Sequence, residues 1–198
     1  CIDISPAEFY RRVRQAPDAA LSSSSGPEPY VEAFRRAARR AKSILCLTEP
    51  ARFSAMFNSA RLAAQAVQKE IGGLNIEVLE CTDTAAAGLG LVTLAAARAA
   101  EEGRKLAEVI ATAKDTMARV HLFASLDTLH YLVKSGRVPQ AAAMVNSLLS
   151  IKPIFTLNRR GARTVALPMS TESAVNRLLH LMEPRVIKDK PLHVAVMH

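Results

Sequence analysis

Short strand-like runs that alternate with helical stretches constrain the fold of this chain most strongly. Residues 43–48 (SILCLT) form a short, bounded apolar run of the kind seen in strands buried on both faces, and residues 75–80 (NIEVLE) predict another strand. A shorter apolar run at 19–22 predicts a strand ahead of them. Helical stretches follow at about 27–41, 53–70, 84–102 and 105–119. This alternation predicts an α/β fold, with a parallel sheet covered by helices on both faces.

The pattern changes after residue 119. In this part we expect strands at 120–124, 151–157, 163–168 and 193–197, and helices at 127–134, 140–149 and 171–182. A Gly in the connection at 158–161 permits a hairpin, so we expect a smaller two-layer α+β subdomain with antiparallel pairing. The predicted domains are residues 1–119 and residues 120–198. Because the chain starts without Met and stops in a predicted strand, we expect a fragment at both ends.

Composition narrows the function classes. The chain has 198 residues and 49% hydrophobic content, enough for a sizeable core. The net charge is +8, but the arginines are spread along several segments without interleaved aromatics, which favours a solvated surface over nucleic-acid binding. Three cysteines without a CxxC pair indicate reduced thiols and a cytoplasmic protein. No run is long enough to span a bilayer.

A serine-rich turn at 22–27 (SSSSGP) separates the first predicted strand from the next helix. Hydroxyls and free N–H groups would meet there at a helix N-terminus, which favours an anion; a flexible linker is the alternative. Ligands of open parallel sheets bind beyond the carboxyl ends of the strands, so the loops at 48–54 and 82–84 should face the same crevice. They carry Ser54, which could instead cap its helix, and Thr82.

The remaining motifs do not form a catalytic site. Gly88 and Gly90 follow a strand, but Thr93 breaks the dinucleotide-binding pattern, so we interpret Gly88 as part of a helix that packs closely on the sheet or walls a narrow apolar channel. The five histidines lack the spacing of a metal site, and we expect no metal and no cofactor. Ser22 or Ser54 as the nucleophile of an α/β hydrolase or transferase remains the alternative function.

Three blocks of the sequence resemble the DegV family of bacterial fatty-acid-binding proteins. The serine turn stands where that family has Thr-Ser-Gln-Pro-Ser-Pro, and residues 53–60 (FSAMFNSA) resemble its Leu-Ser-Gly-Thr-Tyr-Gln-Ser-Ala block. Residues 127–138 (DTLHYLVKSGRV) and 148–154 (LLSIKPI) resemble its Asp-Thr-Leu-x-Tyr-Leu, Gly-Gly-Arg-Ile and Leu-Leu-x-Ile-Lys-Pro-Ile signatures. The similarity covers nearly the whole chain in the same order.

The resemblance implies a non-catalytic protein that buries a long-chain fatty acid and presents it to a separate fatty-acid kinase for phospholipid synthesis. By the same resemblance, the headgroup site comprises Ser22, Ser23, Ser54 and Ala55. Thr82, Gly88 and Arg137 would line the tunnel or the boundary between domains. Ser22 in place of threonine and Ala55 in place of glycine depart from the family pattern at the headgroup. The family's opening strand and its carboxyl-terminal segment are absent, so we expect the pocket to be affected.

Overall fold

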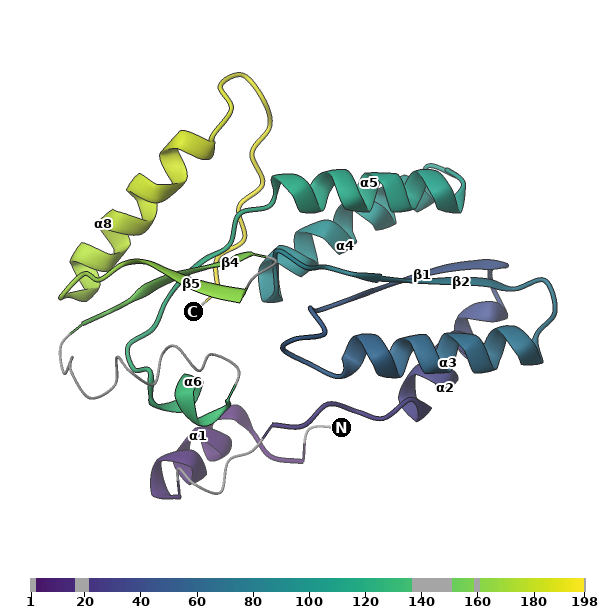
Figure 1. The fold of residues 1–198 in the computed structure, drawn as a ribbon, viewed down its shortest axis with the longest axis horizontal. Coiled ribbons are helices and arrows are strands. Elements are labelled where there is room, and N and C mark those ends of the chain that lie inside the picture. Colours follow the sequence, from purple (N-terminus) through teal and green to yellow (C-terminus); the bar gives the residue numbers. More distant parts are fainter. Residues whose placement is uncertain (1–2, 17–21, 137–150, 159–160, 198) are drawn as a thin grey trace.

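The structure, a computed structural model, describes residues 3–16, 22–136, 151–158 and 161–197. Two sheets organise it (Figure 1): a parallel pair of strands between layers of helices, and an antiparallel sheet of three strands. The N-terminal helix α1 (Pro6–Gln15) lies to one side and buries none of its residues. Ser5 caps its start, since the Ser5 hydroxyl accepts a hydrogen bond from the Glu8 N–H at 3.2 Å.

The parallel sheet consists of β1 (Ser43–Thr48) and β2 (Asn75–Glu80), both with the predicted bounds. Their register runs from Ser43 beside Asn75 to Thr48 beside Glu80, and the crossover between them is α3 (Met56–Glu70). The helix α2 (Glu28–Ala38) precedes β1, while α4 (Ala86–Glu101) and α5 (Leu106–Arg119) follow β2. These helices begin one to three residues later than the sequence predicts, which is the usual uncertainty of helix ends.

Helices cover both faces of the parallel sheet, as predicted. On one face Ile44 and Cys46 pack with Ile76 against α2 and α3, in a core that includes Phe34 and Val67. On the other face the alternate strand residues pack against α4 and α5; they are Leu45, Leu47 and Leu79. This alternation follows from the period of two along a strand, and it explains why β1 contains apolar side chains at successive positions.

The antiparallel sheet has the order β3 (Phe123–Ser125), β4 (Ile154–Asn158), β5 (Gly161–Ala166). A short helix, α6 (His130–Lys134), follows β3, and α8 (Thr171–Met182) follows β5 before the 3-10 turn η3 (Glu183–Arg185). The predicted antiparallel hairpin is therefore confirmed. The division of the chain after residue 119 remains a prediction, although α5 ends at that residue and the second sheet begins after it.

One predicted strand is wrong. Residues 193–197 have the alternating apolar pattern of a strand, but they are irregular in the structure, and Val194 and Val196 are 54% and 82% exposed. A strand needs a neighbouring ladder for its N–H and C=O groups, and neither described sheet provides one for this segment. The strand predicted at 19–22 lies almost entirely outside the described residues, and the helix predicted at 140–149 lies wholly outside them.

Candidate functional site

The serine turn and the loop after β1 meet at the N-terminus of α3, as the loop argument predicts. The Ser24 and Ser54 hydroxyl oxygens lie 2.8 Å apart in a hydrogen bond. The Ala55 N–H donates to Ser24 Oγ at 3.1 Å, and the buried Ser59 hydroxyl donates to the Ser25 carbonyl at 2.9 Å. Three hydrogen bonds therefore attach the turn to α3 and to the two residues before it, and two of the three involve the Ser24 side chain.

The Ser24–Ser54 pair keeps one hydroxyl proton that the bond between the two side chains does not use. Ser24 Oγ accepts from the Ala55 N–H, and Ser54 Oγ accepts from the Met56 N–H at 3.3 Å. The pair has two hydroxyl protons, and one of them is used in the bond between the oxygens, whichever serine donates it. The second proton remains for a ligand. Beside it lies the first turn of α3, whose N–H groups lack partners within the helix.

The hydroxyl that contacts Ser54 belongs to Ser24, whereas the sequence resemblance points to Ser22. Ser22 and Ser23 are exposed in the same irregular segment, and their role as headgroup ligands stays a prediction. Ala55 is the N-cap residue of α3, and its N–H is already donated to Ser24 Oγ. The Ala55 N–H can therefore act on a bound anion only through the Ser24 hydroxyl.

Carboxylates of the protein itself occupy the starts of the two neighbouring helices. The Glu49 Oε1 accepts from the Ala86 N–H at the start of α4, at 3.2 Å. At the start of α2, the Glu28 side chain folds back beside Gly26. The first turn of α3 contains no acidic residue, and its nearest side-chain partners are the neutral serines. Of these three helix N-termini, α3 is thus the one suited to a carboxylate from outside the protein.

The loop after β2 is fixed by its own contacts. Thr82 donates to the Asp83 carboxylate at 3.1 Å, and the buried Thr84 hydroxyl lies against Gly88 in the first turn of α4. Gly88 also lies close to Val120. The small residues of α4 pack on α5 and on the sheet, which matches one of the two roles expected for Gly88; its role as a tunnel wall stays a prediction. Arg137 lies outside the described residues.

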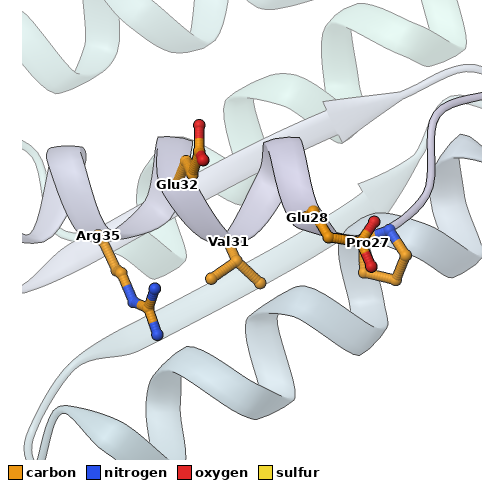
Figure 2. A pocket seen from close by; sticks show the side chains of 5 residues that line it. All are labelled: Pro27, Glu28, Val31, Glu32 and Arg35. Atoms are coloured by element: carbon orange, nitrogen blue, oxygen red, sulfur yellow. The ribbon is translucent and has the colours of Figure 1, made fainter.

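A separate pocket of about 280 Å³ lies along α2 (Figure 2). Its lining comprises Pro27, Glu28, Val31, Glu32 and Arg35. Three of these five side chains are charged, and neither Ser24 nor Ser54 belongs to the lining. An acyl chain would gain little from such a wall, because burial beside charged groups costs them their hydration. We therefore do not place a lipid tail there.

Ser54, a candidate nucleophile, has no general base among the hydrogen-bond partners seen in the described residues. The partners of the Ser54 hydroxyl in this part of the chain are the Ser24 hydroxyl and the Met56 N–H, and neither accepts a proton as a general base does. Burial raises the pKa of the Cys81 thiol to about 11 and also raises that of Cys46. Both thiols stay protonated near neutral pH and are poor nucleophiles. Across the described ranges, no cluster of three metal-ligating side chains occurs.

Sequence reasoning missed the contributions of Ser24, Ser59 and Glu49. For Ser24 the sequence has no distinguishing signal, because four consecutive serines are equivalent until the turn is placed against α3. Ser59 falls within the block that resembles the family, where its position among small residues indicates the buried face of α3. Glu49 directly follows β1, so the rule that placed Ser54 in the crevice also applied to it.

Comparisons with known proteins agree with the fold. A family model matches residues 1–198. Its description is "Uncharacterised protein, DegV family". A DegV domain-containing protein of Clostridium perfringens is 24% identical over 197 residues, which is 99% of this chain and 67% of that protein. A DegV family protein of Thermus thermophilus, described by its fatty-acid binding, is 29% identical with a TM-score of 0.79. That match covers 93% of this chain and 64% of the Thermus chain.

A more distant structure supports the fold alone. The stearic-acid-binding protein of Eubacterium ventriosum is 22% identical with a TM-score of 0.81, over 93% of this chain and 63% of that one. The present chain therefore spans about two thirds of the length of these relatives. None of the helices in the described part of the chain has the length and apolar character that crossing a membrane requires.

Proposed function

Because this chain belongs to the DegV family, we propose that it binds a long-chain fatty acid whose carboxylate lies at the Ser24–Ser54 pair and the first turn of α3. The observation that carries the proposal is the 2.8 Å contact between the two hydroxyl oxygens, which brings two distant loops to one helix N-terminus. The fatty-acid binding described for the Thermus protein supports the class of ligand. Ser22 and Ser23 remain candidate contacts at the same turn.

The chemistry of the site fits a carboxylate on a long apolar chain. One hydroxyl proton and the N–H groups of the first turn can donate to the two carboxylate oxygens, and bonds to a charged acceptor are about twice as strong as neutral ones. No buried cation is needed at such a site. Each CH₂ of the tail removed from water contributes about 0.8 kcal/mol, so most of the affinity would come from the tail.

Affinity measurements on the 198-residue chain and its serine variants test the proposal. Ser24→Ala and Ser54→Ala should each weaken palmitate binding about tenfold. Each removes a hydroxyl that either donates a hydrogen bond to the carboxylate or holds the hydroxyl that does. Ser43→Ala is the matched control, since Ser43 is an exposed serine at the opposite end of β1. Displacement of a fluorescent fatty acid gives the dissociation constants, and mass spectrometry of the denatured protein identifies a co-purified acid.

Two results would contradict the proposal. The first is a folded protein that carries no fatty acid after purification and takes up none when it is added. The second is binding that both serine variants leave unchanged, which would place the headgroup elsewhere in the molecule.

We further propose that the bound acid is phosphorylated by a separate fatty-acid kinase in the cytoplasm. Two observations support this: Ser54 contacts no general base among the described residues, and these residues contain no cluster of three metal-ligating side chains. Incubation of the loaded protein with such a kinase and ATP should yield acyl phosphate, while the loaded protein with ATP alone should yield none. Acyl phosphate formed without the kinase would show that the chain is itself an enzyme.

A further inference from the structure

The loop that carries Ser54 also contacts the antiparallel sheet. Arg52 lies two residues before Ser54, and its Nη1 is 3.0 Å from the position that a Cβ on Gly161 would occupy. Gly161 is the first residue of β5 and has a φ of +122°, a conformation that other residues rarely adopt. The guanidinium carbon is 5.8 Å from the centre of the Phe53 ring, within the range of a cation–π contact. Arg52 thus joins the headgroup loop to the β4–β5 hairpin.

Hydrogen bonds within the loop couple the position of Arg52 to that of Ser54. The N–H groups of Phe53 and Ser54 both donate to the Pro50 carbonyl, at 2.9 and 3.2 Å. The Ala51 N–H donates to Glu80 Oε1 at 2.7 Å, which ties the start of the loop to the end of β2. Residues 50–54 therefore form one hydrogen-bonded turn that is fixed at its start, with Arg52 in its middle and Ser54 at its end.

We propose that Arg52 is a positioning residue for the headgroup: by resting on the backbone at Gly161, its guanidinium holds the turn so that the Ser54 hydroxyl faces the carboxylate. Gly161 allows this close approach, because a Cβ at that position would lie 3.0 Å from Arg52 Nη1 and would push the guanidinium away. This inference rests on the proposed fatty-acid binding. It adds a contribution of the antiparallel sheet to a site whose hydrogen-bonding groups all come from other elements.

The test compares the affinities of wild type, Arg52→Ala, Arg52→Lys and Arg36→Ala for palmitate and for its methyl ester. Arg36 is an exposed arginine on α2, so Arg36→Ala matches the change in net charge. Arg52→Ala should bind palmitate about tenfold more weakly, with a much smaller change for the uncharged ester, because the hydroxyl bonds most strongly to a charged acceptor. Arg52→Lys keeps the positive charge but replaces the planar guanidinium with a compact ammonium group, so it should bind palmitate as weakly as Arg52→Ala.

A double-mutant cycle with Gly161→Ala tests the contact itself. The added methyl group should weaken palmitate binding more in the Arg52 protein than in the Arg52→Ala background, because backbone strain is common to both and cancels in the cycle. Thermal unfolding shows whether each variant folds. If Gly161→Ala does not fold, the affinities of Arg52→Lys and Arg52→Ala still show whether Arg52 acts by position or by charge.

The outcomes separate this inference from the proposed function. A wild-type protein that binds no fatty acid overturns both. Wild-type affinity in Arg52→Lys together with weak binding in Arg52→Ala would show that Arg52 acts by charge at the headgroup, and it would overturn the positioning role. Equal losses for palmitate and its ester would show that Arg52 supports the fold alone. Unchanged binding in Arg52→Ala would overturn the inference and leave the proposed function standing.

Discussion

The two halves of this molecule differ in how completely their apolar side chains are covered. Around the parallel sheet, Val67, Val92 and Ala113 are fully buried, in cores on both of its faces. In the antiparallel half, large apolar side chains stay exposed on α8, on the segment before it and on the segment after it; they are Leu167, Met169, Val175, Leu179, Val186, Ile187, Leu192, Val194, Val196 and Met197. An apolar sequence pattern thus leads to a regular, buried element only where a neighbouring element covers it.

The difference also bears on the site. The hydroxyl pair is attached to α3, whose inner face includes the fully buried Ala60, Ala63 and Val67. A donor on so firmly packed a helix keeps its position, which lowers the cost of ordering it when a ligand binds. The antiparallel half touches the same loop through Gly161. We therefore expect the first half to hold the headgroup and the second half to adjust it.

The largest expected effect is on the buried isoleucine of the antiparallel sheet. Ile154→Ala removes a side chain that is 0% exposed and should lower the free energy of unfolding by about 2–5 kcal/mol. Ile187→Ala makes the same chemical change at a position that is 58% exposed, and it should cost less than about 0.5 kcal/mol. Urea titrations measure both. Equal costs would mean that the difference in burial has no energetic consequence.

The next effect concerns two glycines on α4. Gly88→Ala would place a Cβ 1.8 Å from the Thr84 hydroxyl oxygen, so we expect a loss of about 1–3 kcal/mol from overpacking. At Gly90 no heavy atom beyond the neighbouring backbone of α4 lies within 4 Å of the corresponding position, and Gly90→Ala should stabilise the helix by about 0.5–1 kcal/mol. Thermal unfolding distinguishes the signs. Stabilisation by both variants would show that α4 does not approach Thr84 so closely.

A smaller effect is expected on the uncovered surface of α8. Leu179 is 56% exposed, and glutamine is a good helix former, so Leu179→Gln should change the free energy of unfolding by less than about 0.5 kcal/mol. The same variant should bind less of a dye that reports exposed apolar surface. A large loss of stability would show that another part of the molecule covers Leu179 in solution.

The smallest effect is local to α1, which has no buried residues. Hydrogen bonds from Arg11 and Arg12 lower the pKa of Glu8 to about 2. Because this pKa lies below the usual value of 4.5 for a glutamate, the contribution of Glu8 to the stability of α1 is present above pH 4.5 and is lost as the pH falls towards 2. NMR of the α1 amides should show that α1 of the wild type loses helical structure as the pH falls from 4.5 towards 2. In Glu8→Gln the helical structure of α1 should not depend on pH over this range. An α1 signal that is constant over this range would contradict the assignment.

The sequence identified the two loops that meet at the start of α3, but not which hydroxyl contacts Ser54. The turn, the loop after β1 and their meeting at a helix N-terminus follow from strand–helix alternation and from the rule for ligands of parallel sheets. Within residues 22–25, however, identical side chains provide no pattern that tells one position from the next. The choice of Ser24 depends on how the turn lies against α3, which the bonds from Ala55 and Ser59 determine.

Local sequence alone determined the bounds of β1 and β2, the start of α1 and the hairpin of β4 and β5, because periodicity, capping and turn residues act over a few positions. Only the tertiary structure decided that residues 193–197 are not a strand, that Glu49 takes the start of α4, and that Arg52 reaches Gly161. Those outcomes depend on partners far apart in the chain. A hydrogen-bond ladder, a helix N-terminus or a glycine backbone becomes available to a residue only once the fold has brought it there.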